Sequence, residues 1–114
     1  MTGSINYYVA PGIIISEPKE GMISTIVNNV CNDYDTTPEM ICRRSRITDV
    51  HEPRMVCMYL MRHVANMHLS RIGTYFKLHH TTVIHNLERC KHLMQFELVF
   101  KRRVEALKLK CVFD

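Results

Sequence analysis

Apolar positions in the first part of the chain recur at the spacing of an α-helix. A helix is predicted from 22 to about 34, because its apolar residues lie three and four positions apart and form one face. These residues are Ile23, Ile26, Val27 and Val30. A second, short helix is predicted from 38 to about 43. Thr37 can cap this helix, Pro38 suits its first position, and Glu39 favours the positive end of its dipole.

The pattern changes after this second helix. Residues 43–51 are polar and basic and contain no apolar stripe, which predicts a loop. Glu52, Pro53 and Arg54 then open a longer helix. The apolar face of this helix consists of Val56, Tyr59, Leu60, Val64 and Met67. Such a one-sided stripe is typical of a helix that packs on a core.

The next stretch has the pattern of two helices joined by a tight connection. Ser70 can cap a short helix from 71 to 76. A turn through Lys77 and Leu78 then leads to His79 and a further helix. The apolar face of this further helix consists of Val83, Ile84, Leu87, Cys90 and Met94.

Helical spacing persists towards the C-terminus in Phe96, Val99, Phe100, Val104 and Leu107. This run either continues the preceding helix or adds another one, with a basic exposed face. At the other end of the chain, closely spaced Pro and Gly residues and the lack of a helical period indicate an extended leader. The patterns together predict an all-α fold, a small helical bundle. Its parts are a leader at 1–21, one domain at 22–95 and a C-terminal helical extension at 96–114.

Length and composition indicate one ordinary globular domain. The 114 residues are 46% hydrophobic and 23% charged, which is enough for a single modest core. The apolar runs are too short to cross a bilayer, and the start lacks the pattern of a signal peptide. We therefore expect a cytoplasmic protein without a membrane partner. The five cysteines are scattered and form no CxxC pair, which favours reduced thiols in the core.

Positive charge is concentrated in the later part of the chain. Residues 41–110 contain fourteen of the fifteen Lys and Arg residues but only five of the eleven acidic residues. Such an asymmetry favours a polyanionic partner facing that part of the molecule. Charge alone leaves an ordinary solvated surface open as an alternative.

Histidines are frequent in the stretch LHHTTVIH at 78–85, which raises the question of a metal site or a catalytic centre. His80 and His85 are five positions apart, as are His85 and Cys90, whereas two ligands on one helix face need a spacing of four. Neither a glycine-rich phosphate loop nor a nucleophile motif occurs. We therefore expect no metal, no nucleotide cofactor and no catalytic residues.

A helix that contacts DNA explains the same residues better. The first turn of a recognition helix faces base edges in the major groove, so it needs short polar side chains. Thr81 and Thr82 offer a hydroxyl and a methyl group, and the imidazoles of His79 and His80 can donate or accept a hydrogen bond. A plainer interpretation stays open, because threonine also suits a helix start and His79 could be a weak cap.

Five motifs in succession resemble the C-terminal DNA-binding domain of DnaA, the bacterial chromosomal replication initiator, which belongs to the Trp-repressor-like helix-turn-helix folds. The motifs are IxxIVxxVxxxY (23–34), RRSR (43–46), PR (53–54), LSRIGTYF (69–76) and HTTVIH (80–85). The resemblance covers residues 22 to about 95 and implies double-stranded DNA binding, with replication initiation and origin binding as the family context. No Walker motif occurs in the chain, so we expect a stand-alone domain without the family's ATPase module.

The resemblance also implies site residues. His80, Thr81 and Thr82 match the family's HTT and would contact bases or nearby phosphates in the major groove. Arg44 would enter the neighbouring minor groove. The remaining family contact positions are Arg54, Arg62, Leu69 and Ser70.

Charge and location, rather than the resemblance, add further candidates. The phosphate partners expected on this basis are Arg43, Arg46, Arg71 and Lys77. His79 and His85 lie beside the HTT positions and complete the predicted DNA-binding set.

Three departures from the family pattern change what we expect of the target. His79 stands where the family usually has an aspartate, which should alter both the helix cap and one base preference. The preceding turn is about one residue shorter than in the family and has Lys77 and Leu78 in place of its glycines. The loop between RSR and PR is about two residues longer. The target site should therefore differ from the usual DnaA box.

The leading hypothesis is sequence-specific binding of double-stranded DNA, in replication or transcription control. The alternative is a helical protein-interaction module that keeps the fold but has lost specific binding. The apolar residues between Phe96 and Phe113 are also numerous enough to pair with a second copy. A homodimer through the C-terminal helix is therefore a further prediction.

Overall fold

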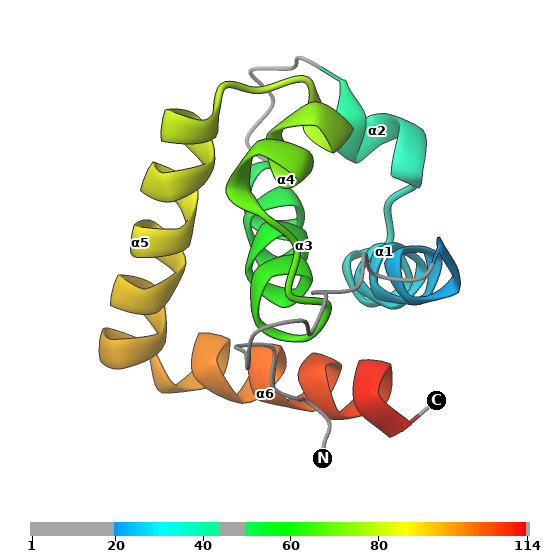
Figure 1. The fold of residues 1–114 in the computed structure, drawn as a ribbon. Helices are drawn as coiled ribbons and strands as arrows, with labels where there is room; N and C mark the ends of the chain where they lie inside the picture. The colour runs from blue at the N-terminus through cyan, green and yellow to red at the C-terminus, as the bar shows by residue number, and fades with distance from the viewer. Residues whose placement is uncertain (1–19, 44–49, 114) are drawn as a thin grey trace, which may run out of the picture.

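The computed structural model describes residues 20–43 and 50–113. Over these residues the chain forms six helices and no strand: α1 (Glu20–Tyr34), α2 (Pro38–Cys42), α3 (His51–His63), α4 (Leu69–Phe76), α5 (His80–Phe96) and α6 (Leu98–Phe113). The predicted all-α fold is confirmed. Helix α3 lies in the middle with α1 and α5 on either side, and α6 runs crosswise from the end of α5 to α1 (Figure 1).

Helix α3 forms the centre of the hydrophobic core. It packs against α1, α2, α4 and α5, and apolar side chains all around it are buried. The predicted apolar face of α1 meets it, with Ile26 and Val30 fully buried. Each such side chain stabilises the fold by about 1.5–3 kcal/mol relative to an exposed one. The core therefore forms around α3, as a small bundle requires.

The cysteines belong to this core. All five are free thiols, and Cys31, Cys57, Cys90 and Cys111 are buried. Burial raises the pKa of Cys31 to about 11 and that of Cys90 to about 12, because the thiolate loses its hydration. The predicted packing in the core is confirmed for these four thiols, and Cys42 is half-buried against the core.

The helix boundaries agree closely with those predicted from the pattern. Helix α1 begins at Glu20, so the last two residues assigned to the leader belong to the helix, and residues 1–19 lie outside the described part of the chain. Helix α2 has the predicted cap, in which the Thr37 hydroxyl accepts a hydrogen bond from the backbone N–H of Met40. Helix α3 ends at His63, so Met67 belongs to the connection after this helix, and its side chain is buried there.

The predicted cap of the fourth helix is wrong. Helix α4 begins at Leu69, with His68 rather than Ser70 at the cap position. The backbone at His68 is extended, and its carbonyl accepts the N–H groups of Arg71 and Ile72, each at 3.0 Å. The helix therefore starts earlier than the hydroxyl suggested, and Ser70 lies exposed in its first turn.

The C-terminal pattern also needs a correction. Helix α5 ends at Phe96, and the chain turns at Glu97 before α6 begins. The helical period does not continue through this break, so Phe96 and Val99 are 67% and 83% exposed instead of buried. The core side of α6 consists of Phe100, Val104, Leu107 and Cys111.

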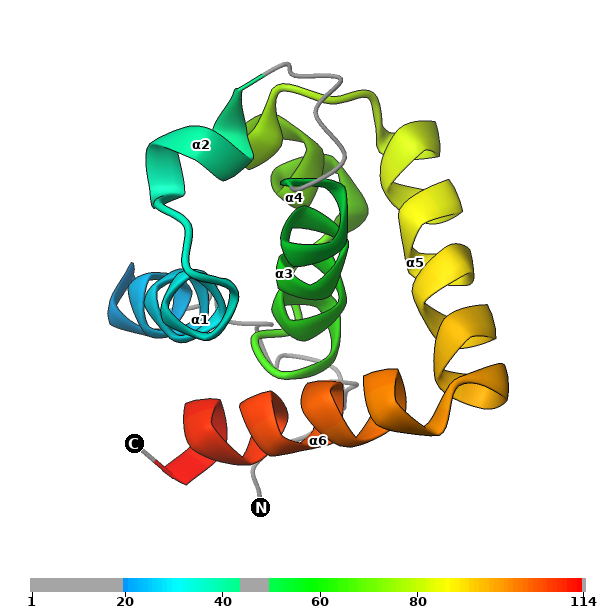
Figure 2. The same cartoon turned by 180° about the vertical axis from the view of Figure 1, so that it is seen from behind.

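Two ends of the molecule are distinct. Helices α2 and α4 and the first turn of α5 lie together at one end, and α6 crosses the opposite end (Figure 2). The first of these ends contains His80, Thr81 and Thr82, three of the residues predicted to contact DNA.

Candidate nucleic-acid interface

Helices α4 and α5 form the predicted helix-turn-helix, and their connection is tight. Lys77 adopts the left-handed backbone conformation, with φ 59° and ψ 43°, and its N–H bonds the carbonyls of Gly73 and Thr74. The N–H of Leu78 also bonds the Gly73 carbonyl, at 2.8 Å. Glycine is usually favoured in this left-handed conformation, and the family has glycines in this turn. Here Lys77 adopts the conformation instead.

The turn lies against Gly73 itself. A Cβ atom at this position would lie 2.5 Å from the carbonyl oxygen of Leu78. Only glycine permits this close approach of α4 to the connection. Ile72, Phe76 and Val83 fill the space between the two helices with buried side chains. The backbone contact at Gly73 and these buried side chains together set the angle between α4 and α5.

His79 caps helix α5. Its Nδ1 accepts the backbone N–H of Thr81 at 3.2 Å and lies 2.7 Å from the Thr81 hydroxyl oxygen. The His79 ring also lies against that of His80, with centroids 4.3 Å apart. This arrangement supports the interpretation of His79 as a helix cap, because its Nδ1 accepts a backbone N–H of the first turn of α5.

The next three residues, His80, Thr81 and Thr82, are all exposed. Successive residues of a helix are rotated by about 100°, so these side chains leave α5 in three directions. Thr81 and His85 are four positions apart and share the exposed outer face of α5. His80 and Thr82 turn towards hollows on either side of the helix.

The hollow on the His80 side joins the start of α4 to the end of α3. It is lined by Arg62, His68, Leu69, Ser70 and His80. Four residues that the family resemblance implied as DNA contacts, Arg62, Leu69, Ser70 and His80, therefore meet at one place. The Arg62 guanidinium is held there by donating from Nη1 to the Met67 carbonyl at 2.9 Å. Helix α4 has no side-chain cap, so its first backbone N–H groups add positive potential beside Arg62.

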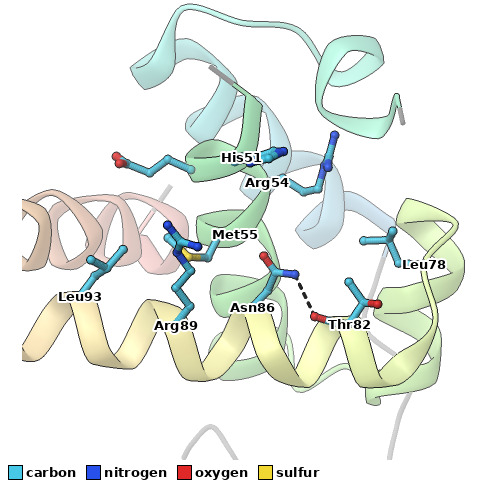
Figure 3. Close-up of a pocket in the computed structure, with 9 residues that line it drawn as sticks. His51, Arg54, Met55, Leu78, Thr82, Asn86, Arg89 and Leu93 are labelled. Carbon is cyan, nitrogen blue, oxygen red and sulfur yellow. Dashed lines mark hydrogen bonds between the residues drawn. The ribbon is translucent and has the colours of Figure 1, made fainter. Parts of the chain in front are cut away.

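The hollow on the Thr82 side lies between α3 and α5. Thr82, Asn86, Arg89 and Leu93 point from α5 towards α3 (Figure 3). The opposite wall comes from the start of α3 and from the turn: His51, Glu52, Arg54, Met55 and Leu78. The Asn86 side chain donates to the Thr82 carbonyl at 2.8 Å, which orders this edge of the helix.

Arg54 lines this hollow and also donates hydrogen bonds to backbone carbonyls of the protein. Its Nε donates to the carbonyl of Ile41 at 2.7 Å and its Nη2 to the carbonyl of Arg43 at 2.6 Å. It thereby satisfies the C-terminal carbonyls of α2, which a helix leaves without partners. Burial lowers the pKa of the Arg54 guanidinium, yet an arginine stays charged in proteins.

The other predicted residues are distributed around this end. Arg43 caps α2 and is exposed, and Lys77 is exposed at the turn. Arg71 is half-buried in α4. Arg44 and Arg46 lie outside the described residues, so the predicted minor-groove contact remains a prediction.

Sequence reasoning missed His51, Asn86 and Arg89 in this region. A usable signal existed for two of them, because Thr82, Asn86 and Arg89 follow each other at spacings of four and three on α5. The position of His51 depends on how α3 packs against α5. No local pattern around that residue indicates this contact.

The part of the chain that the structure describes has neither a metal site nor a membrane span. No group of three or more His, Cys, Asp or Glu residues there could hold a metal ion. No helix among residues 20–43 and 50–113 has the length and apolar character of a membrane span.

Comparison with known proteins identifies the family. The model of the bacterial DnaA protein helix-turn-helix matches residues 23–90, which contain both α4 and α5. The chain belongs to the DnaA C-terminal helix-turn-helix family. The family that the sequence motifs suggested is thus confirmed.

Relatives of this DnaA-type chain are themselves much longer. It is 36% identical over 93 residues to the chromosomal replication initiator protein DnaA of Synechococcus sp. (strain JA-2-3B'a(2-13)), covering 81% of this chain and 20% of that protein. It is 31% identical over 96 residues to the DnaA of Thermoanaerobacter sp. (strain X514), covering 84% and 22%. The chain thus spans about a fifth of the length of these curated relatives.

A solved structure shares the fold of this DnaA-type domain. The crystal structure of a DNA replication initiation factor superposes with a TM-score of 0.71 at 32% sequence identity. The match covers 80% of this chain and 28% of that one. The predicted DnaA-like helix-turn-helix architecture is confirmed by this similarity.

Proposed function

We propose that this chain by itself binds double-stranded DNA sequence-specifically, with the first turn of α5 in the major groove. One observation carries the proposal: His80, Thr81 and Thr82 stand exposed in succession on a helix start at one end of the molecule. Short hydrogen-bonding side chains at this position suit the base edges that the major groove exposes. Membership of a DNA-binding helix-turn-helix family supports the same assignment.

The flanks of α5 suit the DNA backbone. On one side, the uncapped start of α4 and Arg62 line one hollow with Ser70, and both a helix N-terminus and arginine attract phosphate. On the other side, Arg54 and Arg89 line the hollow that contains Thr82. We expect the two strands bordering the major groove to pass over these hollows, with His79 and His85 beside them.

The proposal is one of binding rather than catalysis. The relatives are chromosomal replication initiators, which supports a context of replication control and origin binding for this chain. A role in transcription control is consistent with the same chemistry. The chain would act at chromosomal DNA, in the cytoplasm.

The first test is selection of binding sites from a random duplex library with the chain as it stands. We expect a defined motif that differs from the usual DnaA box at the position affected by His79. Thr81→Ala and Thr82→Ala should weaken binding to the selected site by about 1 kcal/mol each and relax the preference at the contacted base. Ser24→Ala, an exposed hydroxyl on α1, is the matched control and should leave the motif unchanged.

Salt dependence separates this function from the alternative. The logarithm of the DNA affinity should fall with the logarithm of the salt concentration by about 0.9 for each phosphate neutralised. Arg62→Ala should reduce that slope by about one unit, whereas Lys101→Ala should not, because α6 lies at the end of the molecule opposite the first turn of α5 (Figure 1). A library that yields no motif, together with a flat salt profile, would favour the protein-interaction module instead.

A further inference from the structure

Helix α6 is apolar on two opposite sides. Its inner side is buried on the rest of the molecule through Phe100, Val104, Leu107 and Cys111. Its outer side exposes Leu98, Leu109 and Val112 by 58%, 59% and 54%. Apolar side chains that gather in the open on one side of a helix are suited to a partner.

The outer face has the period of a coiled-coil seam. Leu98, Arg102, Glu105, Leu109 and Val112 follow each other at spacings of four, three, four and three. This alternation defines the a and d positions of a heptad, which form one stripe along a helix. The stripe has apolar ends and an oppositely charged pair, Arg102 and Glu105, at its centre.

We propose that this stripe pairs with the same stripe of a second copy of the chain, in antiparallel orientation. A two-fold axis midway between Arg102 and Glu105 brings Leu98 of each copy against Leu109 of the other. The same axis brings each Arg102 against the other copy's Glu105. Every contact then occurs twice, as a two-fold interface requires. This pairing does not depend on the proposed DNA binding.

The central charges select this arrangement over others. A parallel pairing in register would place the two Arg102 side chains together and the two Glu105 side chains together. Such like-charge contacts disfavour the wrong orientation, and a charged pair within an apolar seam is a known way to specify register. An unrelated apolar partner would gain nothing from opposite charges at this spacing.

The contact is small, which predicts a concentration-dependent dimer. A helix of 16 residues is about 24 Å long, so a single helix pair buries less surface than a standard stable interface. Val112 extends past Leu98 of the second copy, towards the exposed Phe96 at its α5–α6 corner. This overhang enlarges the apolar contact at both ends.

Charge reversal tests the pairing in the absence of DNA. Arg102→Glu and Glu105→Arg should each weaken self-association, measured by sedimentation velocity, on the order of tenfold or more. An equimolar mixture of the two variants should associate again, because both contacts between positions 102 and 105 of the unlike chains are then between opposite charges. Lys110→Glu makes the same change of net charge as Arg102→Glu, but outside the seam, and should associate like the wild type.

The test has clear contrary outcomes. A wild-type chain that stays monomeric up to millimolar concentration overturns the proposal, as does an equal effect of Lys110→Glu and Arg102→Glu. Failure of the mixture to associate overturns the antiparallel register. Circular dichroism and thermal unfolding of the dilute variants verify that each monomer is folded, since both substitutions are at exposed positions.

Discussion

His79 shows how one side chain can serve the helix and the recognition surface together. It stands where the family usually has aspartate, and its imidazole performs the capping that a carboxylate would perform, through Nδ1 and the Thr81 N–H. The sequence left a cap and a base contact open as alternatives. The structure supports the cap, and the base contact remains a prediction.

Substitution of His79 separates the two roles. His79→Ala should lower the free energy of unfolding by about 0.5–2 kcal/mol, because the first turn of α5 loses its cap. His79→Asp should restore that stability, since aspartate caps well and suits the positive helix end. Urea unfolding measures the first effect, and site selection with His79→Asp should show a changed base preference. An alanine variant as stable as the wild type would rule out the capping role.

Arg54 was predicted as a DNA contact, yet its visible partners are two carbonyls of the protein. Arg54→Ala should therefore cost about 1.5–3 kcal/mol of unfolding free energy, because charged hydrogen bonds are lost and the end of α2 is left unsatisfied. Arg89 lines the same hollow from an exposed position. Arg89→Ala should therefore change the free energy of unfolding by less than about 0.5 kcal/mol. Equal losses in urea unfolding would contradict this difference.

At the scale of the element, the helix-turn-helix depends on one glycine. Gly73→Ala should lower the free energy of unfolding by about 1–3 kcal/mol, because a Cβ would meet the Leu78 carbonyl and push α4 from the turn. It should also weaken DNA binding by changing the angle of α5. Thermal unfolding and a binding titration measure both effects.

Gly21→Ala is the matched control for this element. No heavy atom lies within 4 Å of a Cβ built at Gly21, so the variant should be as stable as the wild type or gain up to about 1 kcal/mol from helix propensity. A loss similar to that of Gly73→Ala would show that glycine flexibility, rather than close packing, governs both positions.

Most elements were predictable because their signals are local. The apolar period of α1, the Thr37–Pro38–Glu39 start of α2 and the turn at Lys77 depend on neighbours in sequence. The cap of α4 was not predictable from Ser70, because the path of the chain from α3 places His68 at that position. The exposure of Phe96 likewise follows from the turn at Glu97, which interrupts the helical period.

At the scale of the whole molecule, Arg103 on α6 contacts side chains of α1 and so stabilises the packing of α6 on the bundle. Its guanidinium lies over the Tyr34 ring at 3.7 Å and donates to the Asp33 carboxylate at 2.5 Å and to the Asp33 carbonyl at 2.9 Å. The Tyr34 hydroxyl in turn donates to Glu52 on α3. Burial, followed by this hydrogen bond, raises the pKa of Tyr34. One cluster thus joins three helices.

Loss of this cluster should loosen α6. Arg103→Ala should cost about 1–2 kcal/mol of unfolding free energy, an amount that allows for the solvent screening of a partly exposed pair. Arg103→Lys should recover only part of it, because an ammonium lacks the planar fork that stacks and donates twice. Lys110→Ala, exposed on the same helix, should behave like the wild type in urea unfolding.

If both proposals hold, the dimer should join two DNA segments. The first turn of α5 and helix α6 lie at opposite ends of the molecule, so pairing through α6 directs the two DNA-binding ends away from each other (Figure 1). At concentrations where it dimerises, the wild type should capture a labelled duplex on beads that hold a second duplex. Arg102→Glu should bind each duplex alone as the wild type does but capture far less of the second duplex. Equal capture by the two proteins would contradict this arrangement.

The sequence by itself determined the helices, the helix-turn-helix and the family, because periodicity, caps and the HTT motif are encoded over short stretches. The tertiary structure decided which side chains meet. It placed Arg62, Ser70 and His80 around one hollow and Arg54, Thr82 and Arg89 around another. It also left the outer stripe of α6 exposed. These outcomes depend on how helices distant in sequence pack and cross, and a local pattern contains no information about that geometry.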